Sequence, residues 1–458
     1  MFKINKHAFF LVILFCFFSQ CMQAQIKIVA IDIEGNKKTK DYIVLRELPY
    51  RVGDFLVKDS LAYYNKIAQQ QLINTSLFID AEVKSSTTDS LSYRIKITLK
   101  ERWYFFPIPY FRWVDRNFSQ WWNQEHRSLD RVNYGLNLRE SNFTGNNDNL
   151  VIGLITGYTQ QAILRYQFPY FDKKLKYRIG LGMQYFTQKE INTSTSFDQQ
   201  IFYKTEAVIQ KGFRSNINFL YRPNLYERHN FQIGVGQNEI SDSAFYIQPA
   251  FLPTLSKSFN YIDFSFAYSK VKFDYNAYPT NGAATEIAAY HRFSDRSDLS
   301  SFQLRKLWAR PITKNSFVLF ESNSIIKLLP NHNYTDARLM GYGNLQMNGL
   351  EYYVIDGNAG SLWKAEWHHA LGGFTLKNLI AKKILPEIKY KFWFKAFTNL
   401  GYVYADRPIN NTKLSNTLLR TAGLGLDIIS IYDFVLKIDY SLNQLGDKGL
   451  YLHAGLNF

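Results

Sequence analysis

The chain has 458 residues, of which 46% are hydrophobic, and its mean hydropathy is −0.25, values that argue against a bundle of transmembrane helices. A charged fraction of 20% argues against a disordered chain. Lys and Arg exceed Asp and Glu by 54 − 38 = 16. They form no consecutive basic block, so no nucleic-acid partner is expected, and the charge indicates a solvated or lipid-headgroup-facing surface.

Residues 1–24 have the pattern of a secretory signal peptide. Lys3 and Lys6 form a basic start, and the apolar core that follows is too short to span a bilayer. Because Cys16 and Cys21 both lie in this segment, we expect a mature chain without cysteine, and therefore without disulfides or Cys-based metal sites. No later stretch has eighteen consecutive apolar residues, so we expect no transmembrane helix.

Residues 25–102 predict a small α+β domain in the order β-α-α-β-β. Two strands at its end alternate in polarity. The first places Ile79, Ala81 and Val83 on one face. The second predicts an inward face of Tyr93, Ile95, Ile97 and Leu99 and an outward face of Arg94, Lys96, Thr98 and Lys100.

Four short stretches of this domain carry a family resemblance. They are Ile-x-Gly-Asn-Lys-Lys-Thr-Lys ending at Lys40, Leu45-Arg46-Glu47-Leu48, Gly53-Asp54 and Leu72-Ile73-Asn74-Thr75-Ser76-Leu77-Phe78. Together they resemble a POTRA domain, the periplasmic module of outer-membrane assembly proteins; the alternative is an ordinary small domain. The resemblance implies that the strand of Ile79, Ala81 and Val83 captures an extended client by strand addition.

Residues 103–128 predict a connector. Half of the eight tryptophans lie here, namely Trp103, Trp113, Trp121 and Trp122. Pro107 and Pro109 predict that the stretch has no regular structure. The aromatic cluster fits a contact with a membrane interface at a barrel rim, and equally a buried packing cluster between domains.

Residues 129–458 predict an antiparallel transmembrane β-barrel. Ile262 and Phe264 alternate with Asp263 and Ser265, and Phe434-to-Tyr440 alternates in the same way. A polar inner face is wrong for a dry soluble core and right for a membrane barrel with a wet lumen. We expect sixteen strands, near residues 131–140, 148–157, 159–168, 177–187, 203–212, 215–221, 230–240, 260–272, 284–292, 302–310, 316–326, 361–370, 390–402, 417–428, 432–441 and 449–458.

Two features of the barrel segment extend the resemblance to the BamA/TamA-like outer-membrane insertase superfamily, the bacterial surface antigen family. The terminal Phe458 closes an alternating strand and resembles the C-terminal signal of outer-membrane barrels. The sixth extracellular loop, roughly residues 327–360, matches the place where that family has a Val/Leu-Arg-Gly-Phe/Tyr motif folded into the lumen. The matching residues here are Met347, Asn348, Gly349, Leu350 and Glu351.

This motif departs from the family at two positions. Asn348 stands in place of the arginine, and Leu350 in place of the aromatic residue. An arginine offers a fixed charge and a rigid fork of donors that can hold the loop to acidic groups of the barrel wall, and Asn offers neither. We expect Arg338 or Lys364 as the candidates to replace that cation.

The resemblance implies an outer-membrane protein that assists the assembly, insertion or translocation of other outer-membrane proteins. Its partners would be the lipid bilayer and unfolded clients or other assembly subunits, and the barrel would open between strands 131–140 and 449–458. The alternatives are a divergent accessory subunit that inserts nothing, favoured by Asn348 and by having one POTRA domain, and a secretion pore for one dedicated partner.

We expect no catalytic, cofactor or metal site. The paired residues His368 and His369 would point to opposite faces of a strand and so would not share a metal. The sequence has no Gly-rich phosphate loop and no Gly-x-Ser-x-Gly elbow. A lipid-modifying enzyme with a dispersed Ser/His pair stays open as a further alternative, because a fold does not fix a function.

Overall fold

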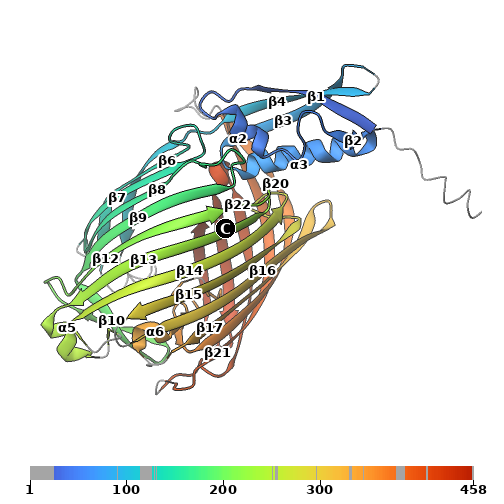
Figure 1. Cartoon of the computed structure of the whole chain (residues 1–458). Coiled ribbons are helices and arrows are strands. Elements are labelled where there is room, and N and C mark those ends of the chain that lie inside the picture. The colour runs from blue at the N-terminus through green and yellow to red at the C-terminus, as the bar shows by residue number, and fades with distance from the viewer. Residues whose placement is uncertain are drawn as a thin grey trace, which may run out of the picture. The chain divides into compact units, whose positions relative to one another are not determined.

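Figure 1 shows the computed structural model of the chain, which describes residues 25–89, 91–113, 126–127, 129, 132–249, 251–252, 256–294, 297–329, 333–343, 345–377, 387–408 and 411–455. The chain divides into two compact units after Glu101. The predicted signal peptide lies outside the described residues. So do Trp121 and Trp122 of the predicted connector and the terminal Phe458.

The first unit is a four-stranded sheet with two helices (Figure 1). The central strands run parallel to each other, and both outer strands are antiparallel to their neighbours. A three-residue strand between the helices adds to the predicted β-α-α-β-β order. In sheet order the strands are β2 (Phe55–Val57), β1 (Gln25–Glu34), β4 (Ser92–Glu101) and β3 (Phe78–Thr87). The two α-helices are α2 (Asp41–Arg46) and α3 (Leu61–Asn74), and the short 3₁₀ helix η1 (Lys58–Ser60) precedes α3.

The core of this unit lies between its sheet and the helix α3. The alternation predicted for β4 is confirmed: Ile95 and Ile97 are fully buried, while Arg94 faces out and pairs with Asp32 of β1 at 2.9 Å. From α3 the core receives Leu61, Ala68 and Leu72, together with the polar Asn65. Asn65 is satisfied there because its Oδ1 accepts a hydrogen bond of 2.8 Å from the Tyr50 hydroxyl.

The second unit is a sixteen-stranded antiparallel sheet, which confirms the predicted fold class (Figure 1). Every strand pairs with its neighbour in the chain, except that the chain leaves the sheet between β9 and β12 and between β17 and β20. In order the strands are β5 (Phe105–Trp113), β6 (Val132–Ser141), β7 (Asn149–Gly157), β8 (Thr159–Gln167), β9 (Tyr177–Gln188), β12 (Gln210–Tyr221), β13 (Glu227–Ile240), β14 (Ser258–Phe273), β15 (Gly282–Ser294), β16 (Leu299–Thr313), β17 (Ser316–Leu328), β20 (Ala359–Lys377), β21 (Glu387–Tyr404), β22 (Leu418–Ile429), β23 (Val435–Asn443) and β24 (Lys448–Gly455).

The first of these strands corrects the sequence analysis. Pro107 and Pro109 were expected to prevent regular structure, yet both lie inside β5. β5 pairs with β6 and is the end strand of the described sheet. The two prolines are two residues apart, so their missing N–H groups fall on the same edge of the strand, and an end strand tolerates that loss.

A second correction removes a strand from the predicted set. The stretch 203–221 was expected to hold two barrel strands, but β12 spans Gln210–Tyr221 without a break. The residues before it form a separate hairpin of β10 (Glu190–Ser196) and β11 (Gln199–Lys204). Because one strand is gained at β5 and one is lost here, the total of sixteen still holds.

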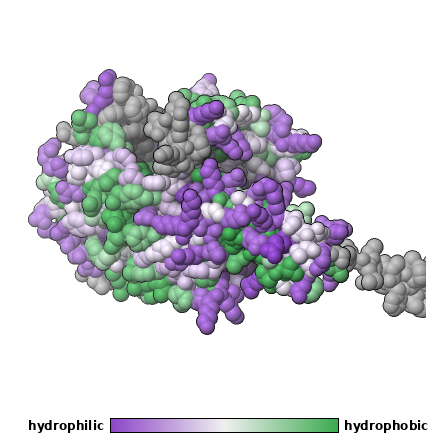
Figure 2. Space-filling model, turned by 90° about the horizontal axis from the view of Figure 1, so that it is seen from above, coloured by the Kyte–Doolittle hydropathy of each residue, from purple (hydrophilic) through white to green (hydrophobic). Residues whose placement is uncertain are grey.

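The faces of the barrel strands differ sharply in polarity, as predicted. Ile262 and Phe264 are 48% and 43% exposed on the outer face, whereas Asp263 between them is fully buried. On β23, Tyr440 is exposed and Asp439 is fully buried. Figure 2 shows apolar residues gathered in patches over the outer surface. Such apolar side chains on an outer wall are suited to contact with lipid. Among the described residues, none of the helices has the length and hydrophobicity that crossing a membrane would require.

Several segments fold against the inner side of the wall. The β10–β11 hairpin and the helix α5 (Asp242–Ile247) share an apolar cluster that includes Ile191, Ala244 and Phe259. The long loop after β17 holds the helix α6 (Tyr334–Ala337) and a two-stranded ribbon of β18 (Arg338–Met340) and β19 (Ile355–Asp356). The hairpin and the ribbon occupy space inside the barrel, so its interior is not an open channel at their level, whereas α5 lies beyond the ends of the neighbouring strands (Figure 1).

Candidate functional site: the lumenal loop

The loop between β17 and β20 joins the eleventh and twelfth strands counted from β5, and it is the loop predicted to be the sixth extracellular one. We call its described residues 333–343 and 345–358 the lumenal loop. Apolar side chains anchor it to the inner wall, because Met340, Met347 and Leu350 share one buried cluster with Leu362 of β20 and Val403 of β21. Burial of this cluster fixes the loop against the wall formed by the C-terminal strands.

Asn348 is the polar centre of the predicted motif. Its Nδ2 donates a hydrogen bond of 2.8 Å to Oδ2 of Asp439 on β23, and its Oδ1 accepts one of 3.3 Å from Nζ of Lys364 on β20. The amide therefore contacts an acidic group of the wall, as the family arginine was expected to do, but it brings no charge of its own. It also contacts a cation, which an arginine at this position would repel.

Gly349 lets the loop approach the wall closely. Its φ of +91° lies in the left-handed region that favours glycine. A Cβ here would lie 3.2 Å from Cβ of Thr421 on β22 and 3.3 Å from Oγ of Ser441 on β23. The main chain of Gly349 is also held, since its carbonyl oxygen accepts a 2.9 Å hydrogen bond from Nδ2 of Asn443.

The two remaining motif residues differ in character. Leu350 is 5% exposed and fills the apolar cluster. Glu351 Oε2 accepts a 2.8 Å hydrogen bond from the N–H of Gly349, and Oε1 lies 3.4 Å from Nε2 of His453 on β24. The motif therefore contacts three consecutive strands, β22, β23 and β24, at the C-terminal end of the sheet.

A group of three charged residues lies in the wall behind Asn348, and we call it the wall triad. Nζ of Lys395 on β21 lies 2.8 Å from Asp439 and 3.3 Å from Asp427 on β22. All three side chains are at most 1% exposed. The lysine compensates two buried carboxylates, which would otherwise be costly in the interior.

The wall triad corrects the expectation that Arg338 or Lys364 replaces the missing arginine. Lys364 donates to Asn348 itself, and Arg338 donates from Nη2 to the main-chain oxygen of Asn192 at 2.7 Å. The cation beside the acids is Lys395, which the sequence analysis missed. Its inward parity on β21 was a signal, but only the strand register places it beside Asp427 and Asp439.

A histidine network continues from the wall triad. His368 Nδ1 lies 2.8 Å from the Tyr278 hydroxyl, and that hydroxyl donates to Asp427 at 3.0 Å. His369 instead contacts Ser316 and stacks on the exposed ring of Trp367. The two histidines thus lie in different environments. Among the described residues, no group of three or more His, Cys, Asp or Glu side chains could hold a metal ion.

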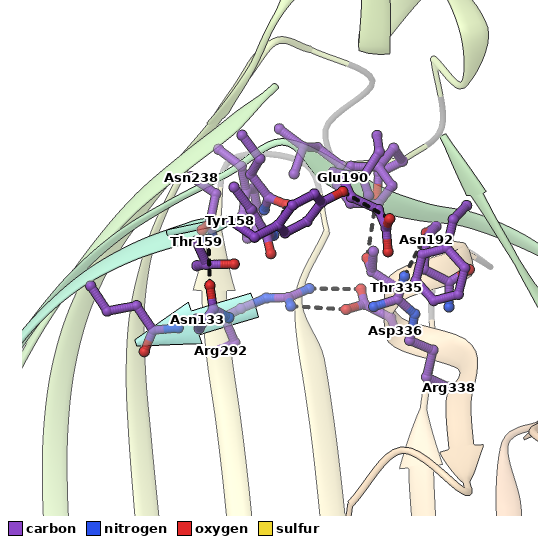
Figure 3. Close-up of a pocket in the computed structure, with 18 of the residues that line it drawn as sticks. Asn133, Tyr158, Thr159, Glu190, Asn192, Asn238, Arg292, Thr335, Asp336 and Arg338 are labelled. Carbon is purple, nitrogen blue, oxygen red and sulfur yellow. Dashed lines mark hydrogen bonds and ion pairs between the residues drawn. The ribbon is translucent and has the colours of Figure 1, made fainter. Parts of the chain in front are cut away.

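The other end of the lumenal loop is held by a direct ion pair, which we call the loop clamp. Arg292 of β15 donates two hydrogen bonds, of 2.9 and 2.7 Å, to the carboxylate of Asp336 in α6 (Figure 3). Both side chains are buried. Lys327 of β17 adds hydrogen bonds to the main-chain oxygens of Asp336 and Arg338. A bidentate pair of this kind is strong and fixes geometry.

The predicted client-binding residues lie on β3 of the first unit. β3 is an edge strand, since β4 is its one neighbour in the described sheet. Ala81 is fully buried and faces the core, whereas Ile79 and Val83 are half-buried. The ladder register shifts between Phe78 and Asp80, so Ile79 lies at a bulge and leaves the simple alternation.

These observations define a class of protein, a POTRA-type domain followed by a sixteen-stranded barrel with an inward-folded loop. Residues 26–102 match the family model described as "POTRA: Surface antigen variable number repeat". This is the architecture of BamA-like POTRA-barrel proteins. The predicted fold is confirmed.

Two solved structures are similar in fold over 94% of this chain. One is BamA from Haemophilus ducreyi lacking POTRA domains 1–3, with a TM-score of 0.51, 14% identity and 84% of that chain covered. The other is CdiB from Escherichia coli, with a TM-score of 0.54, 11% identity and 75% of that chain covered. No curated protein matches the sequence. At these identities the similarity shows the shared fold.

Proposed function

We propose that this protein assists the assembly of other outer-membrane proteins at its strand edges. An extended client would first add to the edge of β3 and would then pass to the barrel edge between β5 and β24. The observation that carries the proposal is that each unit presents a strand edge. β3 has one neighbour, and no ladder joins β5 to β24 among the described residues. Unpaired strand edges are ready templates for another strand.

The barrel edge is placed differently from the sequence-based hypothesis. Strand 131–140 was expected to be the first of the barrel, but β5 precedes it. Proline removes ladder donors, so Pro107 and Pro109 leave β5 with fewer hydrogen bonds to offer at its free edge. A weak junction there supports a site that opens to admit client strands.

The interior of the barrel favours this edge route over passage through the lumen. The β10–β11 hairpin contacts the lumenal loop, because the N–H of Val354 donates to the carbonyl oxygen of Asp198 at 2.8 Å. Asp198 also accepts from the N–H of Lys413 in the loop after β21 at 2.8 Å. A translocated chain would have to displace all three segments.

The first test is photo-crosslinking in cells at Val83 on β3. A photoreactive residue there should capture unfolded outer-membrane proteins. The matched control is Val52, which is 58% exposed in the turn before β2, the strand at the opposite edge of the sheet from β3. Equal capture at both positions would contradict the strand-addition step.

The second test is depletion of the protein followed by outer-membrane proteomics. Broad loss of barrel proteins would support assembly. Loss of one surface protein would indicate a secretion pore for a dedicated partner. No loss would favour a non-inserting accessory subunit, a candidate that Asn348 in place of the family arginine supports.

A further inference from the structure

Lys306 of β16 faces outward from the barrel wall. Its side chain is exposed, whereas the next residue, Leu307, is buried in an apolar cluster with Phe317. The preceding residue, Arg305, faces inward and pairs with Glu321 at 2.8 Å. Among the described residues, no carboxylate pairs with Lys306. The outer wall therefore carries a cation without a counter-charge.

Lys306 lies within the apolar part of the wall and not at its rim. It is the middle residue of the fifteen in β16. Phe302 on one side of it, and Trp308 and Ile312 on the other, are exposed apolar residues of the same face. Arg310 also faces out, nearer the end of the strand. A lysine surrounded by lipid in the middle of a barrel wall is destabilising, and this cost decreases toward the membrane interfaces.

The row of paired residues through Lys306 differs from an apolar row elsewhere on the same wall. Across β9, β12, β13 and β14 the outward-facing row consists of Leu181, Ile217, Ile233 and Phe264. Lys306 instead pairs with Thr285 on β15 and Ser322 on β17. A hydroxyl group gains nothing from contact with lipid tails, but it can bond to a polar group of a neighbouring protein. This row is therefore suited to a polar contact within the membrane.

A groove of about 290 Å³ opens on the wall beside Lys306. The rings of Trp308 and Phe320 stack at 5.7 Å and form one side of it. Trp363 and Leu400, paired across β20 and β21, form the other side. Small residues form its floor, namely Ser322, Ala365 and Thr398. Large rings around small residues are the shape into which the side chains of a protein partner can pack.

We propose that the Lys306 face, formed by Lys306, Ser322 and this groove, docks another protein that spans the outer membrane. That protein would present an aspartate or glutamate to Lys306 and a large apolar side chain to the groove. An ion pair shielded from water by lipid is stronger than one on a soluble surface. The inference depends on a membrane-spanning barrel and not on the assembly function.

Two other occupants fit the Lys306 face less well. The charged groups of a lipid lie outside the hydrocarbon layer, so lipid tails would leave Lys306 unpaired. A second copy of this chain would lie at the same depth in the membrane. On the outer face of its described strands the carboxylates are those of Glu140, Glu227 and Glu239, each the first or the last but one residue of its strand. None lies at the level of a mid-strand lysine, so the partner is a different protein.

The first experiment measures whether Lys306 is costly in lipid alone. Urea unfolding of wild type and Lys306→Met is compared in phospholipid bilayers that contain no other protein. We expect a higher unfolding midpoint for Lys306→Met, because the variant has no charge next to lipid. The matched control is Lys272→Met, an outward-facing lysine that is the last but one residue of β14, and it should not raise the midpoint. An unchanged midpoint in Lys306→Met would overturn the proposal, since the ammonium would then reach water.

The second experiment is photo-crosslinking in intact cells. A photoreactive aromatic residue at Trp363 should form an adduct with one outer-membrane protein. The matched control is the same residue at Phe264 in the apolar row, which is similarly exposed and should give no such adduct. Lys306→Glu should abolish the adduct at Trp363 through like-charge repulsion. The crosslinked region of the partner should contain an aspartate or glutamate, and its replacement by lysine should restore the adduct with Lys306→Glu.

Several results of the crosslinking would overturn the proposal. They are adducts with lipid alone, no adduct at Trp363, an adduct with a second copy of this chain, an adduct that survives Lys306→Glu, and a charge exchange that restores nothing. If Lys306→Glu fails to insert into the membrane, Lys306→Met decides, since undiminished crosslinking in that variant contradicts the ion pair. Client capture at Val83 is a separate readout, so failure of the assembly function would leave these outcomes unchanged.

Discussion

The lumenal loop is held to the wall at two places. One contact is an ion pair between wall and loop, and the other is a hydrogen bond from a neutral loop side chain to a charged group of the wall. At the loop clamp, Arg292 of the wall binds Asp336 of the loop directly. At the wall triad, Lys395, Asp427 and Asp439 all belong to the wall, and the loop contributes the neutral amide of Asn348.

This difference decides what happens when the loop moves. Separating the loop clamp would leave two buried charges without partners, which costs several kcal/mol. Withdrawing Asn348 would leave both ion pairs of the wall triad intact, because Lys395 still contacts Asp427 and Asp439. The electrostatic cost of leaving the wall is therefore lower at the motif end of the loop, where the apolar cluster is the main anchor, than at the α6 end. The cation that the resemblance placed on the loop is here Lys395 of the wall.

The largest effect is expected from Lys395→Met. The change leaves Asp427 and Asp439 buried without a cation, and removing one partner of a buried ionic group costs about 3–5 kcal/mol. The measurement is urea unfolding of the barrel in lipid bilayers, read from tryptophan fluorescence. A loss below about 1 kcal/mol would show that the wall triad is not needed for stability.

Asn348→Arg tests the same comparison in the opposite direction. In the wild-type background the new cation approaches Lys364, which already contacts Asn348 at 3.3 Å, so stability should fall. In the Lys395→Met background the same arginine should reach Asp439 and restore part of the lost stability. A double variant no more stable than Lys395→Met alone would contradict the transfer of the cation from loop to wall.

After Lys395→Met, the next largest loss of stability is expected from Arg292→Ala. Asp336 then lies buried without its partner, and α6 should detach from the wall, with a loss of about 3 kcal/mol or slightly more. Limited proteolysis at the lumenal loop measures detachment. The control is Lys211→Ala, whose exposed ion pair with Glu239 should contribute no more than about 1 kcal/mol. Equal protease resistance in both variants would contradict the clamp.

The fold could be predicted because alternation has a direct physical cause. A strand between lipid and water must present apolar and polar residues in turn, as Ile262, Asp263 and Phe264 do, and that pattern is visible in the sequence. β5 was missed because prolines normally exclude a strand. Their cost disappears at the edge of a sheet, and the position of a strand within a sheet is tertiary information.

The candidate site was only partly predictable for the same reason. The motif residues Met347 to Leu350 contact the inner wall, which the resemblance implied, but their role in function stays a prediction. Lys395 carries no local signal beyond its inward parity. Its partners lie 32 and 44 residues further along the chain, and only the register of β21, β22 and β23 brings them within 3.3 Å. The groove beside Lys306 likewise collects residues of four strands, β16, β17, β20 and β21.

The smallest effect on stability is expected from a change at Asp356. This residue lies on β19, which is outside the membrane-spanning strands, and it is paired with Arg338 in the ribbon next to the loop clamp. Burial raises the pKa of its carboxyl group above the ordinary value, although the positive charges of Arg338 and Lys327 oppose the shift. A carboxyl whose pKa is higher in the folded state contributes stability below its unfolded pKa of about 3.9 and loses it as pH rises through the folded value. Asp356→Asn removes this dependence, so the variant should gain stability relative to the wild type as the pH is raised from 3.5 to 7. Melting temperatures at both pH values measure the difference. A relative gain on acidification would mean that the pairing with Arg338 outweighs burial, which would make β19 a second charged contact of the clamp end.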